Sequence, residues 1–337
     1  MIDALLSKHL KNTIVLCQAC SHFCRLGPGQ TGRCRARQNR AGRLVSLVGY
    51  KTAACHIDPV EKKPLYHFLP TSQTLSMGTA GCNFDCAFCQ NHSLAHIGHP
   101  QKIAGERVLP EQIIQAAKHY QLPSLSYTYS EPTIFLELVY ATGCQAIQAG
   151  LKNIFVSNGF ASPKCLHLLK EVIHAANIDL KSFSNDFYQR YCQARLRPVL
   201  KTLQEIKKMG WWLEVTTLLI PGVNDSETEL QEISRFIINF LGKDTPWHIS
   251  RFHPCYKMNR LSPTPAQSLL RAWEIGKTAG LHFVYIGNMP ELRQTNTLCP
   301  QCRAPLITRT GLRAEIIGLA KGRCQQCGKS LPGIFEL

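Results

Sequence analysis

The sequence predicts an α/β protein with a parallel sheet and a small cysteine-rich segment at each end. The chain has 337 residues, enough for one large domain with appendages. Strand-like and helix-like stretches alternate between residues 74 and 286, which is typical of βα units. We expect strands at 75–77, 124–129, 153–157, 178–180, 213–219, 247–251 and 282–286.

Helices are predicted between these strands from periodicity and end signals. Apolar residues recur at helical spacing from Cys165 to Ile173, and Ser226-Glu227-Thr228-Glu229 has the form of a capping box. Further helical segments are expected at 110–120, 134–149, 181–209, 226–240 and 264–280. The alternation fits a partial barrel or a doubly wound sheet, and periodicity does not separate these two folds.

Composition limits the class of protein and its partners. Lysine and arginine exceed aspartate and glutamate by 16, which favours an anionic partner of some kind. Residues 1–10 lack the apolar region of a signal peptide, and no apolar run reaches the roughly 18 residues of a membrane span. Most of the sixteen cysteines are grouped as metal ligands are. We therefore expect a cytoplasmic protein with no membrane partner.

The central motif is Cys82-x3-Cys86-x2-Cys89, which places three thiols on one short loop. Thiolates select zinc, copper(I) or iron–sulfur clusters. An ordinary [4Fe-4S] cluster takes four cysteines, and no fourth follows here, so one iron would stay open to a non-protein ligand. The alternative is a zinc site with His92 as the fourth ligand.

Polar residues follow the predicted strands, where parallel α/β folds bind ligands. Ser130 and Glu131 follow the second strand, and Asn158 follows the third. Asp179 and Lys181 lie at the end of the fourth, and His253 follows the sixth. Each signal is weak alone, but their order behind the cysteine motif indicates one site.

The motif, with the aromatic Phe88 before its last cysteine, resembles that of the radical S-adenosylmethionine (SAM) superfamily. This resemblance implies a partial (β/α)6 barrel of the TIM type. It also implies a [4Fe-4S] cluster on Cys82, Cys86 and Cys89, whose open iron is chelated by SAM. Phe88 would then pack on the adenosine, and an electron donor such as flavodoxin or ferredoxin would reduce the cluster.

The strand-end segments resemble glycyl-radical activating enzymes, including the pyruvate formate-lyase activating enzyme. The shared features are Glu131-Pro132, Asp179-Leu180-Lys181, Pro221-Gly222 and the position of His253. The resemblance implies that Glu131, Asp179, Lys181 and His253 contact SAM. Ser130, which stands where the family has a glycine, and Asn158, which follows the third strand, are predicted at the same cofactor site. The loop Pro59–Phe68 is similar to that of the radical SAM member of the AmmeMemoRadiSam system, which implies Memo-type and companion proteins as partners.

Two appendages flank the core, which we delimit as residues 1–73, 74–290 and 291–337. The first carries Cys17, Cys20, Cys24 and Cys34, whose spacing fits zinc or an auxiliary iron–sulfur cluster. The last carries Cys299, Cys302, Cys324 and Cys327, two C-x2-C pairs typical of a structural zinc ribbon. A second cluster is the alternative there.

The sequence therefore predicts a radical SAM enzyme that abstracts hydrogen from an unidentified substrate, either a protein glycyl residue or a small anionic metabolite. One alternative is an RNA-modifying radical SAM enzyme, although the ribbon lacks the aromatic residues that stack on single strands. We therefore do not expect nucleic acid as a partner. The other alternative is a non-enzymatic zinc or iron–sulfur scaffold.

Overall fold

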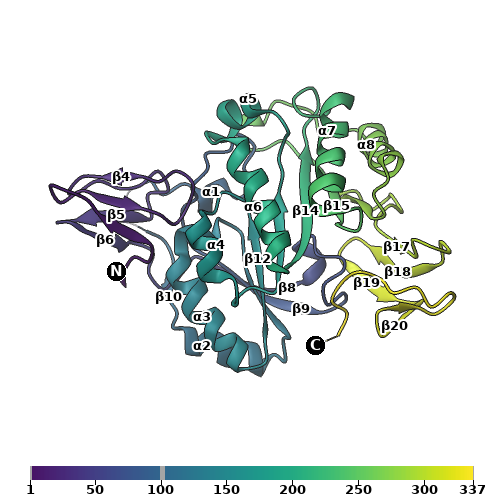
Figure 1. The fold of residues 1–337 in the computed structure, drawn as a ribbon, viewed down its shortest axis with the longest axis horizontal. Coiled ribbons are helices and arrows are strands. Elements are labelled where there is room, and N and C mark those ends of the chain that lie inside the picture. Colours follow the sequence, from purple (N-terminus) through teal and green to yellow (C-terminus); the bar gives the residue numbers. More distant parts are fainter. Residues whose placement is uncertain (1, 99–102, 337) are drawn as a thin grey trace.

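The computed structural model describes residues 2–98 and 103–336 and is built on one eight-stranded sheet (Figure 1). The strand order is β16-β15-β14-β13-β12-β11-β9-β8. Neighbours from β9 to β16 pair in parallel, and β8 pairs antiparallel to β9. The strands are β8 (Ala54–Pro59), β9 (Gln73–Gly78), β11 (Ser124–Tyr127), β12 (Lys152–Ser157), β13 (Ala175–Asp179), β14 (Trp212–Leu219), β15 (Trp247–Arg251) and β16 (Val284–Gly287).

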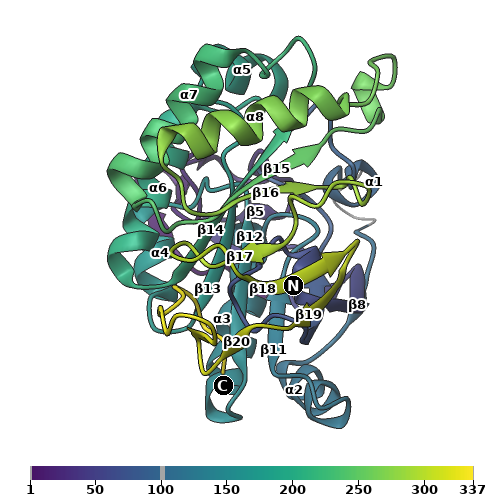
Figure 2. The same ribbon diagram turned by 90° about the vertical axis from the view of Figure 1, so that its right-hand side faces the viewer.

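Helices cover the outer face of this sheet, as a partial barrel requires (Figures 1 and 2). The longer ones are α2 (Pro110–His119), α3 (Leu136–Gln148), α4 (Pro163–Leu169), α6 (Leu196–Met209), α7 (Glu227–Phe236) and α8 (Ala266–Ala279). Within the described residues, the end strands β16 and β8 do not pair, so the barrel is not closed by hydrogen bonds. No helix among those residues is long and apolar enough to cross a membrane.

The predicted α/β class and parallel sheet are confirmed, and most element bounds agree within a few residues. The helix predicted from Cys165 to Ile173 is shorter, because α4 ends at Leu169. The chain then turns, with the Val172 amide donating to the Leu169 carbonyl at 2.9 Å. Val172 still faces the core and packs against Gly143 so closely that an added Cβ there would lie 2.3 Å from it.

The N-terminal segment forms two small antiparallel sheets beside the upper part of the barrel (Figure 1). Their strands are β1 (Ile2–Asp3), β6 (Arg43–Ser46) and β5 (Arg37–Arg40), then β2 (Ser7–His9), β3 (Val15–Cys17) and β4 (Arg25–Leu26). A buried ion pair joins the segment to the barrel, with Arg37 Nη2 at 2.5 Å from Glu137 Oε1 on α3. β8, which follows in the chain, belongs to the main sheet.

The C-terminal segment is a ribbon on the opposite side of the barrel (Figures 1 and 2). It contains β17 (Thr297–Leu298), β18 (Pro305–Thr310) and β19 (Arg313–Ile316) in one sheet, and β20 (Leu319–Ala320) with β21 (Arg323–Cys324) in another. Arg309 of β18 is buried and lies 3.9 Å from the centre of the Tyr66 ring. The ribbon is therefore packed on the loop that follows β8.

That loop closes the amino-terminal end of the barrel around one buried carboxylate. Glu214 of β14 accepts hydrogen bonds from the amides of Tyr66 and His67, from Trp212 Nε1, and from His248 Nε2 at 2.6 Å. Burial raises the pKa of Glu214, but the His248 hydrogen bond and charge outweigh it, so the pKa falls to about 2. The Glu214 carboxylate is therefore charged in the folded protein.

We predict that Glu214→Gln destabilises the fold by roughly 3–5 kcal/mol, because it removes one partner of a buried charged network. The folded pKa is lowered, so this contribution is present above about pH 4.5 and is lost as the pH falls toward about 2. Denaturant unfolding across this range tests both points, with exposed Glu232→Gln as control. Equal stabilities of the two variants would contradict the prediction.

Candidate functional site

The three motif cysteines lie on the loop that follows β9, at the carboxyl end of the parallel strands. The chain leaves β9 at Gly78, where an added Cβ would lie 2.5 Å from the Thr128 carbonyl oxygen. Residues 79–91 then form turns without helix or strand. Cys82, Cys86 and Cys89 are each half-buried on this loop.

The surroundings of these thiols disfavour negative charge when no cation is present. Burial raises the pKa of Cys82 well above its usual value, and it raises that of Cys89 to about 11. A hydrogen bond with the Cys192 thiol, together with burial, raises the pKa of Cys86. The three thiols of this loop suit a cationic metal centre, because a bound cation deprotonates its thiol ligands.

The zinc alternative with His92 is not supported by the geometry. Tetrahedral zinc holds its sulfurs about 3.8 Å apart, given Zn–S bonds of about 2.3 Å. Among the described residues, the group whose metal-ligating atoms all lie within 4.8 Å of one another is Cys299, Cys302, Cys324 and Cys327. His92 instead stacks on Tyr256, with ring centres 4.9 Å apart.

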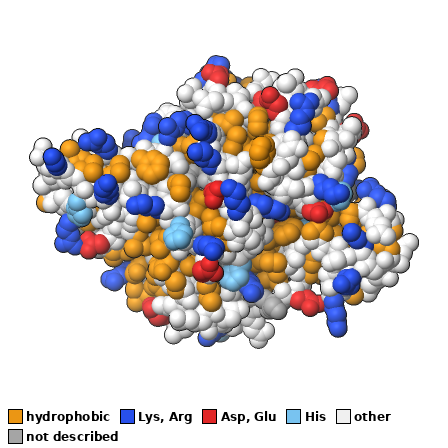
Figure 3. Space-filling view, viewed as in Figure 1, with side chains coloured by type: hydrophobic (Ala, Val, Ile, Leu, Met, Phe, Trp, Pro, Cys, Tyr) orange, Lys and Arg blue, Asp and Glu red, His pale blue; other side chains and the backbone are white. Residues whose placement is uncertain are grey.

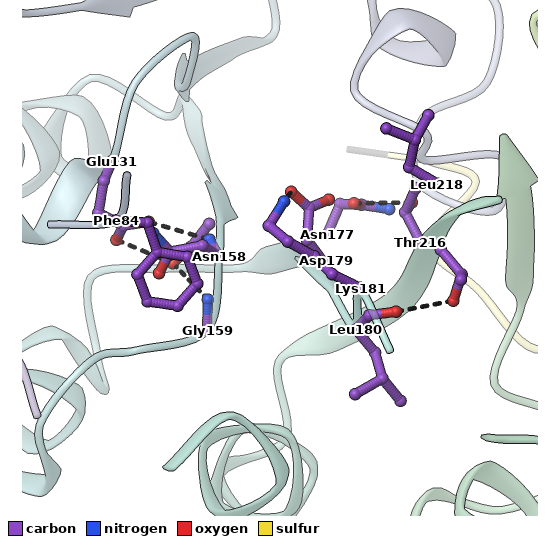
Figure 4. Close-up of polar contacts among 12 residues, drawn as sticks. Phe84, Glu131, Asn158, Gly159, Asn177, Asp179, Leu180, Lys181, Thr216 and Leu218 are labelled. Carbon is purple, nitrogen blue, oxygen red and sulfur yellow. Dashed lines mark hydrogen bonds and ion pairs between the residues drawn. The ribbon is translucent and has the colours of Figure 1, made fainter. Parts of the chain in front are cut away.

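Glu131 connects the ends of β11 and β12 and lies beside Phe84 and Asn158 (Figure 4). Its carboxylate is buried and accepts hydrogen bonds from Thr133, from the Ser157 hydroxyl at 2.9 Å and from the Asn158 amide at 2.9 Å. Burial raises its pKa, while these donors act in the opposite direction. The carboxylate thus holds the two strand ends in register next to the predicted site.

Asn158 extends this connection to the cysteine loop. Its Nδ2 donates to Asn83 Oδ1 at 2.7 Å and lies 3.8 Å from Cys82 Sγ. The Phe84 amide lies 3.4 Å from the same sulfur. Cys82 therefore has two N–H groups directed at its sulfur, the kind of contact that orients and tunes a thiolate ligand.

Asp179 and Lys181 form an ion pair at the end of β13, on the other side of the site (Figure 4). Lys181 Nζ is 2.7 Å from Asp179 Oδ2 and 5.7 Å from the centre of the Phe88 ring. Burial lowers the pKa of Lys181, but the Asp179 carboxylate and the Cys86 thiol raise it well above its usual value. A lasting positive charge therefore lies beside the cysteine loop.

The remaining predicted contacts are more peripheral. Phe88 is buried against Phe187, and the Ser130 hydroxyl donates to the Thr79 carbonyl at 2.7 Å. His253 is exposed after β15 and makes no hydrogen bond to a described residue. The structure thus brings Glu131, Asn158 and the Asp179–Lys181 pair around the cysteine loop, whereas His253 lies at the surface.

The two outer cysteine sets are also assembled. In the ribbon, Cys299 Sγ is 3.6 Å from Cys327 Sγ, and Cys302 Sγ is 3.7 Å from Cys324 Sγ. These four thiols could hold a metal ion. In the N-terminal segment, the thiols of Cys17, Cys20, Cys24 and Cys34 line one small cavity.

Sequence reasoning did not find a polar cluster at the edge of the site. Asp58 of β8 accepts hydrogen bonds from Lys63 Nζ at 2.6 Å and from the Tyr129 hydroxyl. Lys63 Nζ also lies 4.7 Å from the centre of the Tyr129 ring. Tyr129 has a φ of 66°, which is rare outside glycine, and directly precedes Ser130. The charged loop Pro59–Phe68 was the available signal, but nothing in it indicated the partner tyrosine.

Comparisons with known proteins identify the family. Residues 77–232 match the radical SAM superfamily. The chain is 41% identical over 334 residues to an uncharacterised protein of Methanocaldococcus jannaschii, covering 98% of this chain and 99% of that protein. The chain belongs to the radical SAM superfamily.

More distant similarities agree with this family. Another M. jannaschii protein, provisionally named a glycyl-radical enzyme activating enzyme, is 24% identical over 216 residues, covering 63% of this chain and 80% of that protein. The structure of Streptococcus suis SuiB bound to S-adenosylmethionine matches with a TM-score of 0.51 and 14% identity, covering 69% of this chain and 55% of that chain. The SuiB match supports the radical SAM fold alone.

Radical SAM proteins are SAM-binding radical enzymes, and the fold implies a [4Fe-4S] cluster and SAM. The residues present fit both groups. Three soft thiol donors share one loop, and Lys181 with Asp179 offers one positive and one negative charge beside it. The carboxylate of an amino acid pairs with a positive group such as Lys181, and its amino group pairs with a negative group such as Asp179.

Proposed function

We propose that this protein holds a [4Fe-4S] cluster on Cys82, Cys86 and Cys89 and uses it to cleave SAM reductively. The observation that carries the proposal is the loop itself, with three half-buried thiols at the carboxyl ends of a parallel sheet. A reduced cluster held by these thiols would supply the one electron that splits SAM into methionine and a 5′-deoxyadenosyl radical, which would take a hydrogen atom from the substrate.

The chain's own residues position and shield the cofactor in this proposal. Lys181 and Asp179 bind the methionyl end of SAM through charge-assisted hydrogen bonds. Phe88 provides an apolar surface for the adenosine, and Glu131, Ser130 and Asn158 fix the strand ends that border the cofactor. We propose His253, which is exposed after β15, as a further contact of SAM. The protein thereby orients SAM and limits the access of water to the radical.

The substrate and the partners follow from the same family likeness. We propose a protein glycyl residue or a small anionic metabolite as the hydrogen donor, in view of the net charge of +16. A one-electron donor such as flavodoxin or ferredoxin supplies the reducing equivalent. The Pro59–Phe68 loop supports membership of the AmmeMemoRadiSam system, with Memo-type and companion proteins as partners.

We predict that Cys82→Ala, Cys86→Ala and Cys89→Ala each abolish SAM cleavage, because each removes one of the three loop thiolates from the cluster. The measurement is the yield of 5′-deoxyadenosine from anaerobically reconstituted protein under reducing conditions. Cys55→Ala, at an exposed position of β8, is the matched control and keeps wild-type yield. A wild-type yield from any loop variant would contradict the assignment.

We predict that Asp179→Ala and Lys181→Ala weaken SAM binding about ten- to a hundredfold, while the iron content stays at the wild-type level. Losing one hydrogen bond to a charged group costs roughly 1.5–3 kcal/mol, which corresponds to that range. Calorimetric titration with SAM gives the affinity. Lys208→Ala removes an exposed ion pair with Glu205 on α6 and serves as the control. An unchanged affinity in both site variants would show that SAM binds elsewhere.

We also propose that Cys299, Cys302, Cys324 and Cys327 hold a structural zinc ion, because two pairs of their sulfurs lie 3.6 and 3.7 Å apart, as in a zinc tetrahedron. Four thiolates leave no open position for chemistry. We predict that Cys302→Ser removes zinc and lowers the melting temperature of the ribbon, while SAM cleavage per folded molecule is retained. Elemental analysis with circular dichroism tests this. A wild type without zinc would overturn it.

A further inference from the structure

We propose that Cys17, Cys20, Cys24 and Cys34 hold a second iron–sulfur cluster, not zinc, and that this cluster passes electrons to the centre on the Cys82–Cys89 loop. The second half of this inference rests on the proposed function, whereas the first half does not. The chain has one cysteine set near each end, and the separations between their sulfurs differ in a way that distinguishes a single ion from a cluster.

The distances between sulfurs within each set differ between the N-terminal set and the ribbon. The ribbon thiols approach within 3.6 and 3.7 Å in pairs, as a single tetrahedral ion requires. Among the described residues, no three of the four N-terminal thiols have all their sulfurs within 4.8 Å of one another, although all four line one cavity. Thiols that converge on a common space but stand too far apart for one ion fit a polynuclear cluster, whose irons are spread apart.

The cavity is built for a thiolate centre. Arg37 is buried beneath it, with Nη1 4.0 Å from Cys17 Sγ and Nη2 paired to Glu137. A buried guanidinium that faces a sulfur offsets the negative charge of thiolate ligands. Gly32 borders the same space, where an added Cβ would lie 3.7 Å from Cys34 Sγ and 3.8 Å from Cys24 Sγ.

The N-terminal set also touches the predicted catalytic loop at two points. The Cys34 carbonyl oxygen would lie 2.9 Å from a Cβ added at Gly81, the residue before Cys82. His22, between Cys20 and Cys24, donates from Nε2 to the Asn83 carbonyl at 2.8 Å. These contacts are made to the residues on either side of Cys82, so the N-terminal cysteine set lies next to the loop that would accept the electron.

The outer side of this site suits an acidic electron donor. Cys24 is half-buried at a surface hollow lined by Phe23, Arg25 and Arg33, all three of which are exposed. Basic side chains are spread over the N-terminal segment, at the left of Figure 3, with few acidic ones. We assign the hollow to an acidic, low-potential flavin protein. That protein is oxidised by one electron, the N-terminal cluster carries the electron, and the loop centre is reduced.

The metal test uses the full chain in three combined variants. In C82A/C86A/C89A we expect about two to four irons per chain, one zinc and the absorption and paramagnetic spectra of an iron–sulfur cluster. Adding C20S and C34S to that protein removes the iron and leaves the zinc. In contrast, C302S/C327S removes the zinc and leaves the iron. If C82A/C86A/C89A contains zinc but no iron, the first half of the proposal is wrong.

These outcomes separate this inference from the proposed function. If the wild type contains no more iron than C82A/C86A/C89A, the Cys82–Cys89 loop holds no cluster and the proposed function fails. The N-terminal assignment would still stand in that case. If C82A/C86A/C89A has lost the iron of the wild type and retains only zinc, the proposed function stands and the inference fails.

The electron route is tested by rapid-freeze spectroscopy of the loop cluster during reduction. We expect Arg25→Glu combined with Arg33→Glu to slow reduction by an added flavodoxin at least tenfold, while reduction by dithionite stays unchanged. These side chains bind no metal, so the test does not depend on a cysteine variant folding. Arg313→Glu, exposed on the ribbon, is the control. Unchanged flavodoxin rates in the double variant would overturn the proposed route.

Discussion

The irregular loop that carries Cys82, Cys86 and Cys89 contains no helix or strand, so its backbone must be held in place by other parts of the fold. Its backbone is bound from three sides. The Asp85 and Ala87 amides donate to the carbonyls of Cys192 and Tyr191 at 3.1 and 2.8 Å, and the Ala87 carbonyl accepts from Lys257 at 3.0 Å. The Gly81 amide donates to Leu94 at 2.9 Å. Tyr191, Cys192 and Lys257 are more than 100 residues away in the sequence, so the site forms only when the barrel is folded.

The parallel core was predictable because its strands alternate regularly with helices. Trp247–Arg251 agrees residue for residue with β15, and the strand-end position of Glu131 and Asp179 follows from the fold class. The predicted capping box at Ser226 is only half formed. Ser226 Oγ accepts from the Glu229 amide at 3.3 Å, but the Glu229 carboxylate binds Ser182 and Phe183. A tertiary partner outcompeted the local one, which no local pattern reveals.

The contacts between appendages and barrel could not be predicted, because they join residues without any shared periodicity. Arg37 appeared as one arginine among many in a basic segment, yet it is buried against Glu137. Likewise, nothing in the spacing of Cys17, Cys20, Cys24 and Cys34 decides between zinc and a cluster. That choice depends on how far apart the folded backbone holds the sulfurs, which is a three-dimensional property.

Charged side chains are buried at the amino-terminal end of the barrel and partly exposed at its carboxyl end. At the amino-terminal end, Glu214 and Arg309 are buried and hydrogen-bonded to Tyr66, His67 and Thr297. At the carboxyl end, Asp179 keeps about a third of its side chain exposed, and the cysteine thiols stay half-buried. Burying a charge without partners is costly. The partly exposed Asp179–Lys181 pair avoids that cost and leaves these charges accessible to the ligand that we propose.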